Sequence, residues 1–461
     1  MPIDSSKMTD DRFRGCYGSQ CSPVTVSKWV KKNIIQNIER EDNGSPKIAL
    51  NIWGLPGMGK TSVVKQLKND KLPFRKKDAE GNLLPAEEMN IRIVDIPLAQ
   101  IEEMGDVLGY PVEEIQLQKN GTPVWVKAVD SIIKNKLDEG YFLTGAKRTT
   151  YAPPSWVPTE ECPGVILFDD GNRASQRIMK GLMQLVQDHR TISWSLPRGW
   201  TIVFTGNPDN RYNQVTSMDG AQLTRMKHVT LKFDYRQWAE WAIAEGLDQR
   251  GIDWVLAKPE EVTCKERTNP RTIAEFLRTM KNYKNLLDSE AIKELTIEAN
   301  SCLDEDTWTS MMTFFNSSQE KMIAPTLILD DPDTAVRNMM DLKNNGRLDI
   351  ISVANDRLVL YIKSDEYKYD DKHKQAFLKW MKAMHEVADD LMCAAVAFLN
   401  EDRDKLQAVP MEFLFQPSTP GAKSVRIKRT KADYIFNLVN DNVFCNAIKE
   451  LKSPTDLEQF K

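Results

Sequence analysis

The order of apolar and polar positions predicts a parallel α/β fold in the first half of the chain. Short apolar runs, each of the length of a buried strand, occur at residues 48–53, 91–96, 164–168, 201–205 and 228–233. After the third run, Ile178, Leu182 and Leu185 recur at helical spacing. Strands that alternate with helices build a parallel sheet with both faces covered. We therefore expect an α/β domain over residues 46–235, preceded by a polar, partly helical extension at residues 1–45.

The second half of the chain has different patterns. Residues 236–323 are patterned as helices. Residues 347–362 alternate apolar and polar positions around Asn355 and its neighbours, as a β-hairpin would. Over residues 377–398 the apolar positions repeat at spacings of three and four, which predicts one long helix. This seam lasts only about three heptads, so a core face within the chain is favoured over a coiled coil between chains. We expect residues 324–461 to form an α+β domain.

The composition indicates a folded protein of several domains. The chain has 461 residues, of which 41% are hydrophobic and 28% charged, and such values argue against wholesale disorder. No window approaches the 18 or so consecutive apolar residues of a transmembrane helix, and the N-terminus lacks the pattern of a signal peptide. Lys and Arg number 62 against 66 Asp and Glu, which argues against a surface built wholly for polyanions. We therefore expect a cytoplasmic protein without membrane association.

Cysteine and histidine spacing argues against a structural metal site. The 7 cysteines and 4 histidines include no CxxC pair and no cluster at zinc spacing. Reduced thiols, the normal state in the cytosol, are the favoured interpretation. The carboxylates Asp330, Asp331 and Asp333 lie just before a helical pattern, so we expect them to cap a helix rather than bind a metal.

The strongest chemical signal is a phosphate-binding loop. Gly54-Leu-Pro-Gly-Met-Gly-Lys-Thr61 fits the pattern G-x-x-x-x-G-K-S/T, follows an apolar run and precedes a segment that can begin a helix. Glycines let backbone N–H groups turn inward and hold phosphate oxygens, while Lys60 would reach the β- and γ-phosphates. The Thr61 hydroxyl would bind Mg²⁺. The candidate nucleotide-binding residues are Gly54, Pro56, Gly57, Met58, Gly59, Lys60, Thr61 and Ser62.

Such a loop needs an acid at the end of a neighbouring strand. Asp169 and Asp170 directly follow the apolar run at residues 164–168. Asp169 is the candidate second ligand of Mg²⁺, and Asp170 is placed to act as the general base that activates a water molecule. For Asp170 alone, a helix cap would be a credible alternative.

With these residues in place, the stretch from about residue 48 to 280 resembles an AAA+ ATPase of the MoxR-like branch. The resemblance is carried by Phe168-Asp-Asp-Gly-Asn-Arg-Ala174, by Asn207-Pro208 after the fourth apolar run, and by Ala221-Gln-Leu-Thr-Arg225, in that order. It implies ATP and Mg²⁺ as cofactors. It also implies a P-loop AAA+ parallel sheet flanked by helices, followed by a small helical lid at residues 236–323.

The resemblance also assigns roles by position. Asn207 would be the first sensor, which holds the attacking water or the γ-phosphate. Arg225 would be the arginine finger that reaches the nucleotide of a neighbouring subunit, where a guanidinium stabilises the charge on the transferring phosphoryl group. Arg271 would be the second sensor, in the helical lid. Arg173 could be a second such arginine or a structural ion-pair partner.

These roles imply an oligomer, expected to be a six-membered ring, that hydrolyses ATP to remodel a protein partner. Proteins with a von Willebrand factor A-type domain are partners that the resemblance suggests. Two alternatives stay open. The first is a nucleic-acid motor, although the basic segment 423–431 is better interpreted as a charge-protected edge strand. The second is a slowly hydrolysing nucleotide switch, because Asp170 stands where the family usually has the longer Glu.

Overall fold

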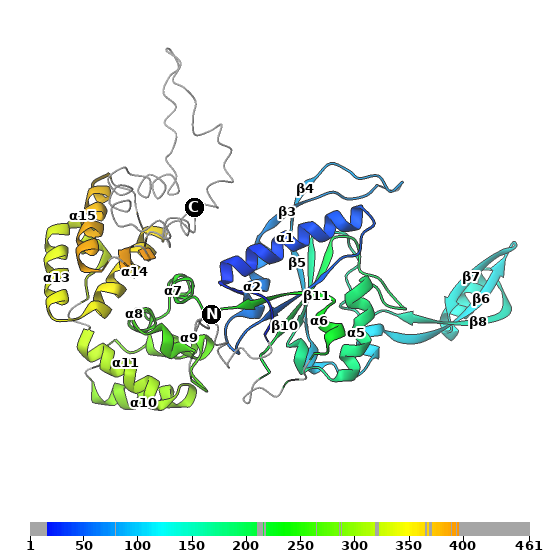
Figure 1. Ribbon diagram of the computed structural model, residues 1–461. Helices are drawn as coiled ribbons and strands as arrows, with labels where there is room; N and C mark the ends of the chain where they lie inside the picture. The colour runs from blue at the N-terminus through cyan, green and yellow to red at the C-terminus, as the bar shows by residue number, and fades with distance from the viewer. Residues whose placement is uncertain are drawn as a thin grey trace, which may run out of the picture. The chain divides into compact units, whose positions relative to one another are not determined.

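The computed structural model describes residues 16–395, apart from residues 79, 210–214, 216, 217, 264, 285, 287, 319–321, 365, 366, 368–370, 389 and 393. These residues form two units (Figure 1). The first contains the described residues up to Asp234 together with Asn269–Arg271. The second contains Tyr235–Thr268 and the described residues from Thr272 onward. The predicted division into four domains stays a prediction.

A six-stranded parallel sheet forms the centre of the first unit. Its strands, in spatial order, are β1 (Gln20–Cys21), β11 (Met226–Leu231), β2 (Ala49–Trp53), β10 (Trp200–Gly206), β9 (Gly164–Asp169) and β5 (Arg92–Pro97). All neighbouring pairs are parallel. The five predicted strands and the predicted α/β P-loop fold are confirmed. The sixth strand, β1, is a two-residue edge strand that the apolar pattern did not predict.

Helices cover both faces of this sheet, because each carries one apolar side. On one face, α1 (Pro23–Asp42) and α2 (Lys60–Gln66) pack against inward residues such as Leu50 and Val203. On the other face, α5 (Gln176–Asp188) packs Ile178, Leu182 and Leu185 against the sheet, as their spacing predicted. α1 and α5 each begin at a serine, and such side chains cap the free N–H groups of a first helical turn.

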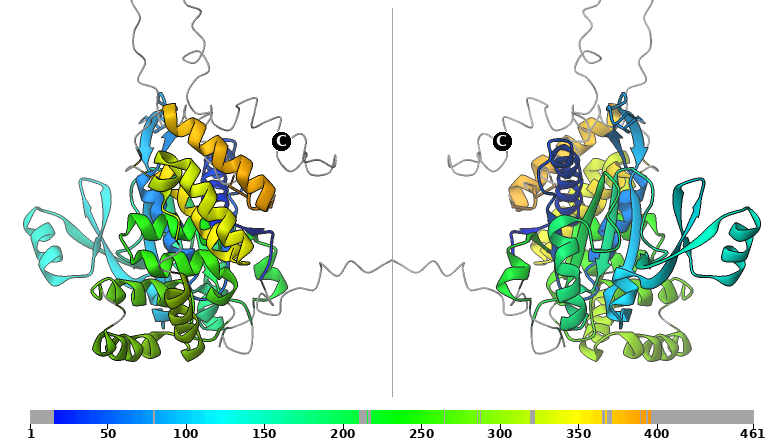
Figure 2. Two further views of the ribbon diagram at one scale, coloured as in Figure 1. Left: turned by 90° about the vertical axis from the view of Figure 1, so that its left-hand side faces the viewer. Right: turned by 90° about the vertical axis from the view of Figure 1, so that its right-hand side faces the viewer.

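An arm that the sequence did not predict interrupts the first unit between β5 and β9. It follows the short helix α3 (Gly105–Leu108) and consists of β6 (Tyr110–Lys119), β7 (Thr122–Lys127), α4 (Asp130–Asp138) and β8 (Phe142–Ala152). The three strands form an antiparallel sheet in the order β7-β6-β8. The arm extends away from the parallel sheet (Figure 1, Figure 2). A smaller antiparallel pair, β3 (Lys71–Phe74) and β4 (Glu87–Asn90), follows α2.

The second unit is helical in its described residues. Its helices are α7 (Tyr235–Ala244), α8 (Gln249–Ala257), α9 (Pro270–Met280), α10 (Ser289–Cys302), α11 (Glu305–Ser318), α12 (Pro325–Asp330), α13 (Pro332–Asn344), α14 (Leu348–Lys363) and α15 (Asp371–Val387). Helix α13 begins at Asp331, whose side chain accepts from the N–H of Thr334 at 3.2 Å, so the predicted cap is confirmed. Within the described residues, no helix is long and apolar enough to cross a bilayer.

The predicted hairpin at residues 347–362 is wrong, because this segment is helix α14. Its polar centre is not a turn. Asn355 donates to the Leu391 carbonyl at 3.0 Å, and Asp356 pairs with Arg236 at 2.9 Å. These buried bonds explain why a core helix carries polar residues that look like a turn in sequence. The described part of residues 324–395 is therefore helical, and segment 423–431 lies outside the described residues.

The predicted helix at residues 377–398 is present in its first part. Helix α15 covers it as far as Val387, and Phe377, Trp380 and Met384 are buried on its inner side. The helix packs against α12 and α13 of the same unit. Its apolar seam is therefore a core face, as the sequence favoured.

Candidate functional site

The phosphate loop has the backbone shape that its glycines predict. Strand β2 ends at Trp53, and helix α2 begins at Lys60. Gly57 and Gly59 have φ angles of 76° and 85°, which L-residues with a side chain rarely adopt. A Cβ on Gly57 would also lie 2.2 Å from Oδ1 of Asn269, so both the backbone conformation and the lack of space favour glycine at this position. The loop is thereby free to present its backbone N–H groups.

Lys60 is buried and fully occupied by acceptors of the same unit. Its side chain is 7% exposed. Its Nζ donates to the carbonyls of Gly54 at 2.9 Å and Leu55 at 3.1 Å, and to Oδ1 of Asn207 at 2.8 Å. Burial lowers the pKa of Lys60 to about 8, while the charges of Asp170 and Asp169 act in the opposite direction. The ammonium is therefore held at the loop by contacts that a phosphate can replace.

Thr61 and Asp169, the two predicted magnesium ligands, are in direct contact. The Thr61 hydroxyl donates to Oδ1 of Asp169 at 2.7 Å, and the hydroxyl of Thr205 donates to the same oxygen at 2.5 Å. Thr205 is fully buried at the end of β10. A hydroxyl and a carboxylate side by side are oxygen donors of the kind that Mg²⁺ prefers, so the residues present fit this ion.

Asp170 and Asn207 meet beside the loop. Oδ1 of Asp170 accepts from Nδ2 of Asn207 at 2.8 Å. Asp170 has a φ of 51°, a left-handed conformation that Asp and Asn tolerate better than most residues. Its N–H donates to the Thr205 hydroxyl at 2.9 Å. Because Asn207 also accepts from Lys60, its amide joins the phosphate loop to the candidate base.

The three candidate arginines lie in different places. Nε of Arg173 lies 3.6 Å from Oδ2 of Asp170, and both side chains are exposed. Arg225 is exposed and donates to Oε1 of Gln187 at 3.0 Å and to the Ala221 carbonyl at 2.6 Å. These bonds hold it to the last turn of α5 and to α6 (Gly220–Leu223).

Arg271 is also exposed. Its backbone N–H donates to Oδ1 of Asn269 at 3.0 Å. Its positive charge contributes to the lowered pKa of Lys60, which places it within electrostatic reach of the loop. The structure thus brings Lys60, Thr61, Asp169, Asp170 and Asn207 together, with Arg271 nearby.

Two residues of the site carried no predicted role. Thr205 joins Asp169 to the backbone of Asp170 through its hydroxyl. Asn172 is 3% exposed and bonds to the backbone of Asn207. A polar residue at the end of an apolar run was the available signal for Thr205. Asn172 stands in the stretch Phe168–Ala174 that carries the family resemblance, which was its available signal, but its bonding partner lies 35 residues away in the sequence.

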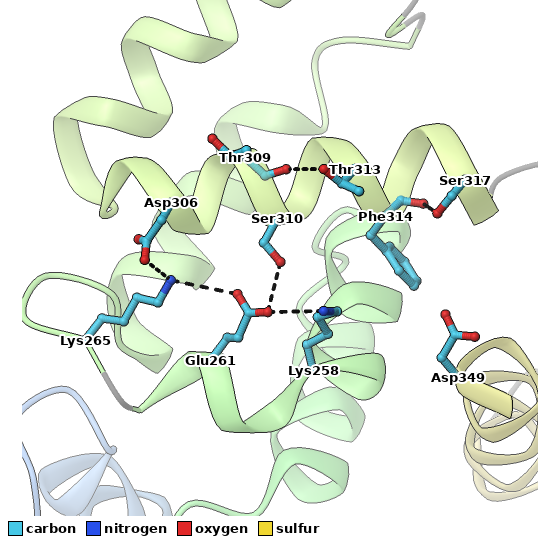
Figure 3. A pocket seen from close by; sticks show the side chains of 10 residues that line it. All are labelled: Lys258, Glu261, Lys265, Asp306, Thr309, Ser310, Thr313, Phe314, Ser317 and Asp349. Carbon is cyan, nitrogen blue, oxygen red and sulfur yellow. Dashed lines mark hydrogen bonds and ion pairs between the residues drawn. The ribbon is translucent and has the colours of Figure 1, made fainter. Parts of the chain in front are cut away.

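A separate cavity lies within the second unit (Figure 3). Its volume is about 540 Å³, and it is lined by Lys258, Glu261, Lys265, Asp306, Thr309, Ser310, Thr313, Phe314, Ser317 and Asp349. Glu261 is its centre: it accepts from Ser310 at 3.0 Å and pairs with Lys258 at 3.3 Å. Lys265 pairs with Asp306 at 2.7 Å. Asp349, the remaining charged residue of the lining, pairs with Arg347 at 2.8 Å.

No family model and no curated protein matches this chain. Among solved structures it is similar to the Thermotoga maritima RuvB Holliday junction branch migration motor, at 11% identity and a TM-score of 0.30, over 65% of this chain and 79% of that chain. A mutant of that protein gives 12% identity and a TM-score of 0.31, over 65% of this chain and 79% of the mutant chain. At such TM-scores the similarity carries no argument about function, which rests on the geometry of the site.

Proposed function

We propose that this chain is an ATP-binding and ATP-hydrolysing P-loop enzyme of the AAA+ type. One observation carries the proposal: Lys60, Thr61, Asp169, Asp170 and Asn207 converge through direct hydrogen bonds at the carboxyl ends of parallel strands. Ligands of open α/β sheets bind at this edge. A phosphate loop beside a hydroxyl–carboxylate pair and a second carboxylate is the arrangement that phosphoryl transfer to water requires.

The binding step is an exchange of partners at the loop. Lys60 would give up the carbonyls of Gly54 and Leu55 and donate to the β- and γ-phosphates. The negative phosphates favour the charged form of Lys60 and so oppose the effect of burial on its pKa. Thr61 and Asp169 would hold Mg²⁺, which supplies charge neutralisation to the phosphates when bound.

The hydrolysis step uses the second carboxylate and the sensor. The oxygen of a water molecule bonds to the γ-phosphorus while the bond from that phosphorus to the β–γ bridging oxygen breaks. Asp170 accepts a proton from the water, and the amide of Asn207 orients it. Asn207 already bonds to Asp170 at 2.8 Å, so the two groups share one side of the loop.

We further propose that the enzyme works as a ring of six subunits on a protein partner in the cytoplasm. Support comes from Arg225, which is exposed and fixed by Gln187 and Ala221 rather than bonded to the acid pair. An arginine presented in this way can reach the nucleotide of a neighbouring subunit. A protein with a von Willebrand factor A-type domain is the partner class that the sequence resemblance suggests.

The decisive experiment is a mixing assay of ATP hydrolysis. Lys60→Ala and Arg225→Ala should each abolish turnover, whereas Arg225→Ala should still bind ATP. An equal mixture of the two variants should recover part of the activity, because a Lys60→Ala subunit still lends Arg225 to an intact loop. Arg177→Ala, which removes an exposed arginine of helix α5, serves as the surface-charge control. Full activity of Arg225→Ala alone, or a mixture without recovery, would contradict the shared site.

One alternative is favoured by a specific observation. Asp170 has a left-handed backbone conformation, which Asp adopts more readily than Glu, so the backbone at this position favours the shorter carboxylate. A misplacement of about 1 Å can cost around 10²-fold in rate, which would make the chain a slow nucleotide switch. ATP binding without turnover would support the switch, and turnover stimulated by single-stranded DNA would support a nucleic-acid motor.

A further inference from the structure

The backbone of Asn207 is gripped by the side chain of Asn172. Nδ2 of Asn172 donates to the Asn207 carbonyl at 2.7 Å, and Oδ1 of Asn172 accepts from the Asn207 N–H at 3.1 Å. Asn172 is 3% exposed and Asn207 is 2% exposed. A side-chain amide that bonds both groups of one residue fixes that residue in position and orientation, as a neighbouring strand would.

The two hydrogen bonds from Asn172 take the place of the bonds that strand β9 would make to Asn207 if it continued. The last register pair of β9 and β10 is Phe168 with Phe204. Beyond it, Asp170 adopts its left-handed conformation and the chain enters a short 3-10 helix, Gly171–Arg173. Strand β9 therefore cannot pair with Asn207, and the side chain of Asn172 returns from that helix to supply both bonds. Buried backbone groups need such partners.

We propose that Asn172 is a positioning residue for ATP hydrolysis, acting through Asn207; this inference rests on the proposed function. With its backbone fixed, the amide of Asn207 has its oxygen on Lys60 and its nitrogen on Asp170, both at 2.8 Å. Without the grip, Asn207 can shift relative to both groups. Binding of the nucleotide depends on the loop and is spared, whereas orientation of the water depends on Asn207 and is lost.

Only asparagine satisfies this geometry. Aspartate keeps the acceptor for the Asn207 N–H but has no donor for its carbonyl. Leucine has a similar shape and neither group, and glutamine is one methylene longer. Loss of one partner leaves a buried backbone group unsatisfied, which destabilises the folded chain. A change in Asn172 therefore also lowers stability, so its test needs a control that shares this cost.

The chain contains a matched control at the amino ends of the same parallel strands. Nδ2 of Asn37 donates to the Ile48 carbonyl at 2.9 Å, and Oδ1 of Asn37 accepts from the Ile48 N–H at 3.0 Å. Asn37 is 3% exposed, like Asn172. Ile48 directly precedes β2, at the end remote from the phosphate loop. Both asparagines bond the N–H and the carbonyl of one residue, and Asn37 also donates to the Thr201 hydroxyl at 3.2 Å, so Asn37→Leu should lower stability at least as much.

The experiment compares Asn172→Leu with Asn37→Leu in the full chain. Both variants should melt at a lower temperature. For Asn172→Leu, kcat should fall about 10- to 100-fold with KM for ATP changed less than about threefold. The affinity for ADP with aluminium fluoride, a transition-state mimic, should fall about tenfold or more, while the affinity for ADP alone stays the same. Asn37→Leu should change none of these constants per folded molecule. If Asn172→Leu does not fold, Asn172→Asp takes its place.

The outcomes separate the two proposals. An active wild type with Asn172→Leu no slower than Asn37→Leu overturns the inference and leaves the proposed function standing. In an Asn207→Ala background the effect of Asn172→Leu should vanish, and a persisting loss of rate would show that Asn172 does not act through Asn207. A wild type that neither hydrolyses ATP nor prefers the mimic over ADP overturns both proposals. A wild type that binds the mimic more tightly than ADP but does not turn over ATP refutes hydrolysis. The mimic affinities of Asn172→Leu and Asn37→Leu then still show whether Asn172 positions Asn207.

Discussion

The parallel sheet has two ends, one at the amino ends of its strands (the amino edge) and one at their carboxyl ends (the carboxyl edge). The two carry similar residues that make different kinds of contact. At the amino edge, Arg198 is 5% exposed and forms two bonds of 2.7 Å with the carboxylate of Asp42. At the carboxyl edge, Lys60 is 7% exposed and bonds to two carbonyls and to Asn207. Each edge thus has a buried cation, and each has an asparagine that grips a backbone.

The difference lies in whether the bonds can be exchanged. The planar guanidinium of Arg198 matches one carboxylate on both sides, so the pair is closed and has no need of a ligand. Lys60 is a point charge held by neutral acceptors, with two carboxylates near it that are not its direct partners. A phosphate can replace those neutral acceptors. Burial of a charge therefore indicates a site only where the charge lacks a matched partner.

Among the changes that test this contrast, the largest effect is expected for Asp170→Asn. The introduced amide keeps the left-handed backbone and an oxygen for Asn207, so the fold and nucleotide binding should persist. Without a carboxylate to accept the proton, turnover should fall about 10²- to 10⁴-fold. Steady-state kinetics beside equilibrium ATP binding would measure this. Equal loss of binding and turnover would show that Asp170 supports the loop rather than the chemistry.

At the amino edge, Arg198→Leu should act on stability alone. It leaves the carboxylate of Asp42 without its cation and removes a contact over the ring of Phe74 at 4.6 Å. Breaking a buried pair of this kind costs about 3 kcal/mol or more. Urea unfolding should show this loss, with kcat per folded molecule unchanged. A fall in kcat at full folding would break the contrast between the two edges.

A smaller effect is expected from the titration of Lys60. With a pKa of about 8 in the nucleotide-free protein, Lys60 is charged below that pH and neutral above it. Phosphate binds the charged form, so the affinity for ADP should be constant below about pH 8 and fall by up to about tenfold per unit above it. Fluorescence titration of a labelled ADP would follow this, and Lys60→Met should give weak binding without that dependence.

The last effect is a pH dependence of stability rather than of binding, and it concerns His189, at the end of α5 near the amino edge. It is 2% exposed, and neither ring nitrogen has a hydrogen-bond partner within the described part of the chain. Burial, and then the charge of Lys47, lowers the pKa of His189 to about 3. The unfolded chain therefore binds its proton first, and stability should fall with acidification from about pH 6.5 to pH 3, by at most about 1.4 kcal/mol per pH unit.

His189→Asn is the matched variant for this effect. Asparagine tolerates the left-handed φ of 54° at this position and does not titrate. Its chemical unfolding should depend less on pH over this window than that of the wild type. Equal slopes for the two proteins would show that His189 is hydrated or paired in solution.

Sequence patterns predicted what is local and missed what is not. The five core strands and the phosphate loop follow from apolar runs and a motif of fixed spacing. The arm was missed because β8 is mostly exposed and β6 buries only two of its residues, so their apolar residues form no run. The hairpin at residues 347–362 was wrong because buried Asn355 and Asp356 bond to distant groups. A pattern along the chain records burial and spacing but not the partner across space.

The arm has a consequence for how such a chain can change over time. Its first and last residues, Tyr110 and Ala152, are register partners on β6 and β8. Paired residues of antiparallel strands lie only about 5 Å apart, so the arm leaves the fold and returns at almost one point. A gene could gain, shorten or exchange this cassette without displacing the strands that carry the phosphate loop. The arm and the strand ends that carry the phosphate loop can therefore change independently of each other.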